Sequence, residues 1–124
     1  MASELRVNTL KDASGNNSIA TSFVAGGSAK VYFHFNMSTA SIQDSLNASS
    51  VTDSSAGTFL MNVSSAMTDS EYATLSASGD NATHNASTDT NQPTSSSQYR
   101  HNHFENNSAA DVANVSNSVL GDLA

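Results

Sequence analysis

The segment Lys30–Asn36 constrains the fold more than any other part of the chain. Its apolar residues recur at every second position, as Val31, Phe33 and Phe35. The residues between them are polar or amphipathic. An apolar period of two is typical of a β-strand that buries one face and leaves the other outside the core. The chain therefore needs a second layer to cover that face.

Further short segments with strand-like spacing follow at residues 41–46, 59–63, 71–77, 97–104 and 112–120. Residues 51–58 are polar and contain a glycine, which predicts a connecting turn. Several short strands with turn signals between them predict an all-β, antiparallel β-sandwich or barrel-like domain. The expected core comes from the apolar positions of the two clearest strands: Val31, Phe33, Phe35, Phe59, Met61 and Val63.

The strand pattern begins only near residue 30, which predicts two parts. Residues 30–124 form the β domain, with a long polar loop at 78–97 that contains the only proline. Residues 1–29 form an extended arm, too poor in apolar residues to bury itself. Its apolar residues are expected to dock on the domain or on a neighbouring subunit: Leu5, Val7, Leu10, Ile19 and Phe23.

Composition limits the classes of partner. The formal net charge is −7, and only four Lys or Arg residues are present. Nucleic acids and anionic membranes require basic patches, so neither is expected to bind. The chain has no cysteine and no apolar stretch near the ~18 residues of a membrane span. The N-terminal residues lack the apolar region of a secretory signal.

Several segments together resemble tail-fibre-like virion proteins of tailed phages of marine and cyanobacterial hosts. Residues 4–15 (ELRVNTLKDASG) are similar to that group's L-x-V-N-T-I/L-x-D-x-S-G stretch, and 29–36 (AKVYFHFN) to its A-K-A-W-V-N-F-N segment. Residues 45–53, 57–66 and 115–122 resemble its S-F-N-V-S-S-I-T-D, G-x-Y-x-V-N-F-x-x-A and V-N-V-A-I-F-G segments. Tyr32 stands where the group has Trp, and 78–97 match no motif of the group.

The resemblance implies a non-enzymatic virion protein on the exterior of the phage particle, made in the host cytoplasm. It further implies a tail-fibre-type module whose N-terminal arm attaches to other tail or capsid proteins, and a homo-oligomer, with a trimer favoured. The chain lacks the coiled-coil or repetitive shaft of a long fibre. A capsid-bound decoration protein, of the knob or cement type, therefore stays open as an alternative.

A glycan-binding host adhesin is a further alternative. Tyr32 and Tyr99 are expected to be exposed and to offer stacking faces for sugars, and the amide-rich residues 78–97 would offer hydrogen bonds. The competing interpretation is that these are ordinary surface or interface residues.

His101 and His103 are the candidate metal ligands. Residues two apart in a strand project to the same face, so both imidazoles could meet symmetry mates on an oligomer axis. Imidazole suits transition metals such as Zn, Ni, Cu or Fe. The alternative is that both residues line the solvent face of a strand whose other face carries Phe104, and that the protein binds no cofactor.

No catalytic residue is expected. Serine is abundant, so a Ser/His/Asp set is available by number alone, but the chain has no G-x-S-x-G motif. Most acidic residues stand beside Ser, Thr or Gly, where Asp commonly caps turns by bonding to nearby backbone groups.

Overall fold

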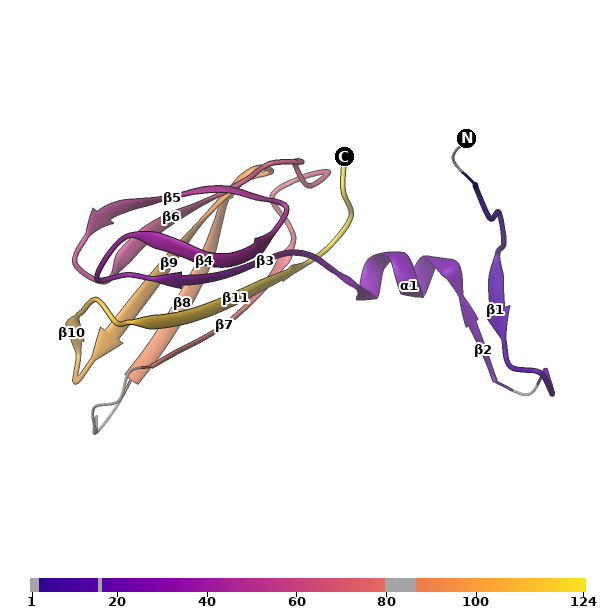
Figure 1. The fold of residues 1–124 in the computed structure, drawn as a ribbon, viewed down its shortest axis with the longest axis horizontal. Coiled ribbons are helices and arrows are strands. Elements are labelled where there is room, and N and C mark those ends of the chain that lie inside the picture. Colours follow the sequence, from indigo (N-terminus) through magenta and orange to yellow (C-terminus); the bar gives the residue numbers. More distant parts are fainter. Residues whose placement is uncertain (1–2, 16, 80–86) are drawn as a thin grey trace.

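The computed structural model describes residues 3–15, 17–79 and 87–124. Two antiparallel sheets pack face to face in a β-sandwich (Figure 1). The first sheet has the order β4-β3-β11-β7. Its strands are β3 (Ala29–Asn36), β4 (Ser41–Leu46), β7 (Ala73–Gly79) and β11 (Asn114–Leu120). The predicted all-β sandwich is therefore confirmed.

The second sheet is built around the pair β6 and β9. Its strands are β5 (Ala48–Ser55), β6 (Thr58–Val63), β8 (Ser87–Ser95), β9 (Gln98–Glu105) and the short β10 (Ser108–Ala109). β9 pairs with β6, β8 and β10, and β6 also pairs with β5. Pro93 lies in β8 opposite Tyr99. β8 pairs with β9 alone among the described strands, and such an edge position tolerates proline, which has no backbone N–H to donate.

Aromatic rings from the two sheets interlock in the core. The six side chains expected there are all buried, together with Met37, Met67, Tyr72, Tyr99, Val112, Val115 and Val119. The ring of Phe33 on β3 packs edge to face on that of Tyr99 on β9, with 6.1 Å between the ring centres. The ring centres of Phe35 and Phe59 are 5.6 Å apart. Each fully buried apolar side chain contributes roughly 1.5–3 kcal/mol, so this cluster is the main source of stability.

A glycine fixes the turn between β5 and β6. Gly57 has a φ of 67°, and a Cβ at this position would lie 2.5 Å from the backbone oxygen of His103. Its own carbonyl accepts the N–H of His103 at 2.8 Å. The backbone of β9 therefore passes too close for any side chain here.

Three parts of the predicted organisation need correction. Residues 48–55, most of which were expected to form a turn, are strand β5, and residues 87–95 of the expected polar loop are strand β8. The rest of the expected loop lies partly outside the described residues. The arm is not uniformly extended: it contains β1 (Thr9–Lys11), β2 (Ser18–Ala20) and α1 (Thr21–Gly27), which leads into β3 (Figure 1).

Candidate functional site

Strand β9 turns both candidate metal ligands into the interior. Tyr99, His101 and His103 occupy alternate positions and share the inward face, with His101 0% and His103 1% exposed. Phe104 faces outward and is 37% exposed. The two histidines do share a face, but the expectation that this face lies on the surface is wrong. Packing against the aromatic core decides which face of β9 points inward. Phe35 packs edge to face on His101, with 6.0 Å between the ring centres.

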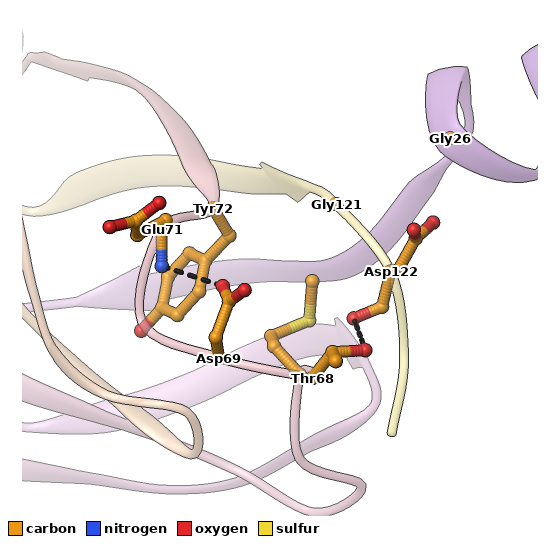
Figure 2. Close-up of a pocket in the computed structure, with 8 residues that line it drawn as sticks. Gly26, Thr68, Asp69, Glu71, Tyr72, Gly121 and Asp122 are labelled. Atoms are coloured by element: carbon orange, nitrogen blue, oxygen red, sulfur yellow. Dashed lines mark hydrogen bonds between the residues drawn. The ribbon is translucent and has the colours of Figure 1, made fainter.

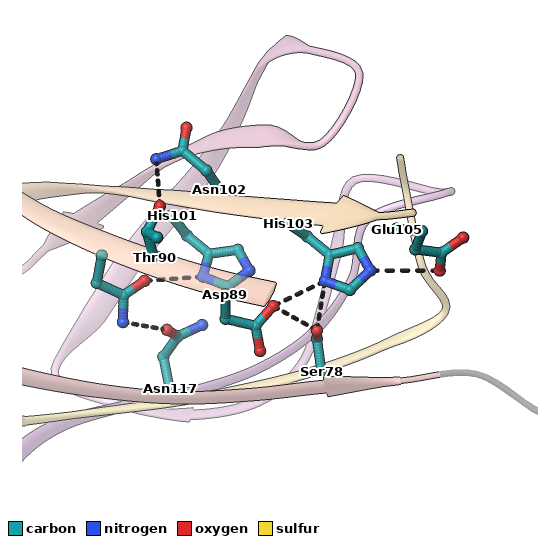
Figure 3. A network of polar contacts seen from close by, with 9 residues as sticks. Ser78, Asp89, Thr90, His101, Asn102, His103, Glu105 and Asn117 are labelled. Carbon is teal, nitrogen blue, oxygen red and sulfur yellow. Dashed lines mark hydrogen bonds and ion pairs between the residues drawn. The ribbon is translucent and has the colours of Figure 1, made fainter. Parts of the chain in front are cut away.

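His101 belongs to a chain of neutral polar side chains between the sheets (Figure 3). Its Nδ1 lies 2.8 Å from Oδ1 of Asn91 on β8, and Nδ2 of Asn91 donates to Oδ1 of Asn117 on β11 at 2.9 Å. Burial lowers the pKa of His101 to about 4, while Asp89 opposes this shift and His103 adds to it. The imidazole is therefore neutral near pH 7, with Nδ1 as its donor to Asn91.

His103 sits in a charged cluster nearer the end of β9 (Figure 3). Its Nδ1 lies 2.7 Å from Oδ1 of Asp89 and 2.6 Å from Oγ of Ser78, and its Nε2 lies 3.3 Å from Oε1 of Glu105. The Ser78 hydroxyl donates to Asp89 at 2.5 Å. These contacts join β7, β8 and β9, so polar bonds hold the edge strand β8 to the opposite sheet.

Ser78, His103 and Asp89 do not have the geometry of a catalytic triad. In a triad the carboxylate bonds to one imidazole nitrogen and the serine to the other. Here both Ser78 and Asp89 contact Nδ1, while Nε2 faces Glu105. The ring is also 1% exposed, so a substrate could not reach it. The cluster is a structural bridge.

The interior position also bears on the metal expectation. Ligands on an oligomer axis must reach the protomer surface, whereas both imidazoles lie between the sheets. Within residues 3–15, 17–79 and 87–124, no three His, Cys, Asp or Glu side chains are arranged to hold a metal ion. A metal at His101 and His103 stays a prediction, which this geometry does not favour.

A shallow acidic cavity lies where the arm joins the sandwich (Figure 2). It has a volume of about 300 Å³, and Met67 and Tyr72 form part of its wall. Three carboxylates line it: Asp69, Glu71 and Asp122. Oδ1 of Asp69 accepts the backbone N–H of Glu71 at 2.8 Å, the local capping expected for Asp in a turn.

The outer face of the sheet β4-β3-β11-β7 carries a row of directly paired residues. Leu46 pairs with Tyr32, Tyr32 with Ser118, and Ser118 with Leu75. Leu46 is 50% and Leu75 54% exposed. The Tyr32 hydroxyl lies 3.3 Å from Oδ2 of Asp44, so a carboxylate adjoins the row. We call Leu46, Tyr32, Ser118 and Leu75 the outer row.

The aromatic residues proposed for sugar stacking are separated by the fold. Tyr32 is half-buried on the outer face, whereas Tyr99 is fully buried and cannot stack on a ligand. His34 is half-buried on the same outer face as Tyr32. Tyr99 could have been recognised as inward-facing from sequence only by fixing the phase of β9 first.

The apolar side chains of the arm remain uncovered. Leu5 is 81% exposed and Phe23 73%, and Val7, Leu10, Ile19 and Val24 are each 39–45% exposed. Helix α1 contains no buried residue. The large apolar side chains of the arm are therefore exposed to solvent in this structure.

No protein-family model, curated protein or solved structure matches this chain. In the part of the chain that the structure describes, no helix has the length and apolar character needed to cross a membrane.

Proposed function

We propose that this chain is a non-enzymatic structural protein on the exterior of a tailed-phage virion. In this proposal it is a tail-fibre-type module: the arm attaches it to other virion proteins, and the sandwich faces outward. One observation carries the proposal. A sandwich with a continuous core is joined to an arm whose large apolar side chains, among the described residues, are each at least 39% exposed. This division suits a protein that works by being mounted on an assembly.

The resemblance of residues 4–15 and 29–36 to tail-fibre-like virion proteins supports the same proposal. The chemistry of the interior agrees with a structural role. Its polar residues bond to one another between the strands, and the histidines are shielded from solvent. The stability of such a module comes from strand pairing and apolar burial.

A capsid-bound decoration protein is the closest alternative, because it would use the same arm and sandwich. The two differ only in where the arm binds.

A glycan-binding adhesin has its own supporting observation. The outer face of the β8-β9-β6-β5 sheet holds linked amides and hydroxyls: Nε2 of Gln98 donates to Asn62 at 2.8 Å, and Nδ2 of Asn62 donates to Ser50 at 3.1 Å. Neutral donors and acceptors held in place suit sugar hydroxyls. Binding on a glycan array that is lost in Gln98→Ala would support this function, and no binding by the assembled protein would reject it.

The test of the proposal is whether the chain is a component of virions. Gradient-purified particles of the phage that encodes it should contain the protein in many copies, as measured by quantitative mass spectrometry. Antibodies against the sandwich should bind intact particles. Absence of the protein from purified particles, or its presence only inside them, would reject an exterior structural role.

A further inference from the structure

The elements of the arm are too small to be stable without a partner. The β1–β2 hairpin has three residue pairs, and α1 has seven residues with no side-chain cap at its N-terminus. Isolated two-stranded hairpins and helices shorter than ~12–15 residues are marginal in water. The side chains of Leu10 and Ile19 pair across the hairpin, yet they stay 44% and 45% exposed. Some surface must cover them for the hairpin to persist.

The distribution of charge indicates what kind of surface this is. Residues 1–30 hold three of the four Lys and Arg residues but only two of the eleven acidic residues. The rest of the chain holds nine acidic residues and one cation, Arg100. Arg6 is already paired with Glu4 at 2.9 Å, whereas Lys11 has no ion pair within the described residues. An acidic surface with apolar side chains would complement this arm.

The total surface is consistent with a missing partner. The chain exposes 7477 Å², whereas a compact monomer of this mass exposes about 6,300 Å². The excess of about 1,200 Å² exceeds the ~800 Å² that each partner buries in a standard interface. Covering the arm and its acceptor would remove an area of this order.

The outer row has the properties that the arm requires. Leu46 and Leu75 are among the most exposed apolar side chains of the sandwich, and Tyr32 lies between them in the row. Asp44 lies beside the row and approaches the Tyr32 hydroxyl. The row crosses all four strands over roughly 14 Å, with a leucine at each end, Tyr32 and Ser118 between them, and the carboxylate of Asp44 at its side.

We propose that the arm of one copy docks on the outer row of a second copy, with the Leu10–Ile19 pair packing on the row between Leu46 and Leu75. Lys11 then faces the acidic sandwich of the neighbour. When such contacts close into a ring, or when two copies exchange arms, every arm is bound to the outer row of another copy. The inference rests on the proposed function in treating the arm as an attachment segment, and it names the partner as another copy of this chain.

The first measurement is sedimentation velocity of the purified full chain over a wide concentration range. We expect a closed oligomer. The variant Leu10→Ser/Ile19→Ser should weaken association at least about tenfold, because apolar burial drives the contact. Lys11→Glu should weaken it more than Lys11→Gln. Phe104→Ser removes an exposed apolar side chain from the other sheet and should associate like the wild type.

A mixing experiment tests which surfaces meet. Leu10→Ser/Ile19→Ser has a damaged arm and an intact row, and Leu46→Ser/Leu75→Ser has the reverse. Each variant alone should be monomeric. Their mixture should form a heterodimer, because one intact arm then meets one intact row. Circular dichroism of each variant checks that the sandwich has folded.

Three outcomes would overturn the inference: a wild-type chain that stays monomeric, a mixture that stays monomeric, or arm variants that associate like the wild type. The arm could also dock on the sandwich of its own chain, and hydrogen exchange at low concentration tests this. Protected β1–β2 amides in a monomer would mean that the arm folds on its own sandwich, which would overturn the inference. Oligomers in solution without incorporation into virions would reject the proposed function alone. A monomer in solution that is found in virions would reject this inference alone.

Discussion

Tyr72 and Tyr99 both bury their rings in the core, but their hydroxyl groups differ in bonding. The Tyr72 hydroxyl lies 2.7 Å from the backbone oxygen of Gln98 and 2.9 Å from that of Ser95, so it ties the β8–β9 turn to the core. The Tyr99 hydroxyl is buried and has no hydrogen-bond partner among the described residues. The same chemical group therefore has opposite consequences for stability at the two positions.

Tyr72→Phe should lower the free energy of unfolding by about 1 kcal/mol, because it removes the hydroxyl that donates to the backbone oxygens of Ser95 and Gln98. Tyr99→Phe should leave stability unchanged or raise it, because it removes a buried hydroxyl that has no partner. Urea denaturation of the two variants and the wild type measures both effects. A larger loss in Tyr99→Phe than in Tyr72→Phe would contradict the core geometry.

His101 should make stability depend on pH. Burial lowers its pKa from 6.5 to about 4, so between these values the unfolded chain takes up a proton that the folded chain does not. Stability is therefore fully present above pH 6.5, falls as the pH drops toward 4, and stays lost below that. A shift of this size corresponds to about 3 kcal/mol.

The measurement is the free energy of unfolding of the wild type and His101→Gln from pH 7 to pH 4. The variant has no group to titrate at this position, so its stability should fall less over this range. Equal pH dependence in the two proteins would show that His101 titrates like an unfolded histidine, which would contradict its burial.

Among the elements, those with apolar alternation were predictable and those with polar inward faces were not. β3 and β6 follow the sequence pattern, because one face of each meets the core. β9 was also expected as a strand, although its inward face carries His101 and His103 beside Tyr99. β8 has no such pattern, because Asp89 and Asn91, which bond into the interior, are polar. β5 contains two half-buried apolar residues, Ala48 and Val51, among exposed polar residues. Pairing with neighbours, which no local pattern records, makes both segments strands.

The same limit applies to the candidate site and to α1. The spacing of His101 and His103 placed them on one face, but the choice of face depends on Phe35 and on the opposite sheet. Helix α1 has seven residues and buries none of them, so its sequence has no apolar stripe that could have predicted it. The exposed apolar residues of the arm were evident from sequence, because too few lie close together to cover one another.

The attachment of β8 gives a prediction at the level of elements. Asp89 bonds to Ser78 and His103, whereas its neighbour Thr90 points outward and bonds to Asn102 at 3.2 Å. Asp89→Ala should lower stability by roughly 2 kcal/mol and speed hydrogen exchange in β8, because it removes the carboxylate that both Ser78 and the buried His103 contact. Thr90→Ala, the matched control, should have a much smaller effect. Equal effects would contradict the bridging role of the cluster.

The β5–β6 turn gives a second prediction at this level. Gly57→Ala places a Cβ in a left-handed conformation and against the backbone of His103. The variant should lose at least about 2 kcal/mol of stability. Gly79→Ala is the control, because nothing lies within 4 Å of its added Cβ and its φ is not in the left-handed region. Thermal denaturation compares the two, and a tolerated Gly57→Ala would mean that β9 does not pass this close.

At the scale of the whole molecule, the chain divides its properties between two parts. The sandwich contains the buried core and nine of the eleven acidic residues, while residues 1–30 contain exposed apolar side chains and three of the four cations. Like-charged sandwiches repel one another, so the sandwich alone gives two copies no electrostatic attraction. The molecule therefore separates an N-terminal segment with exposed apolar side chains and cations from an acidic sandwich with a buried core.

A cryo-electron microscopy reconstruction of the virion tests this account most directly. The account predicts sandwich density on the particle exterior, on the tail or over the capsomers, with residues 3–28 ordered against a neighbouring protein chain. Virions with no density for the sandwich, or a sandwich attached through its own faces while the arm contacts nothing, would contradict the claim that this protein is a virion module mounted by its arm.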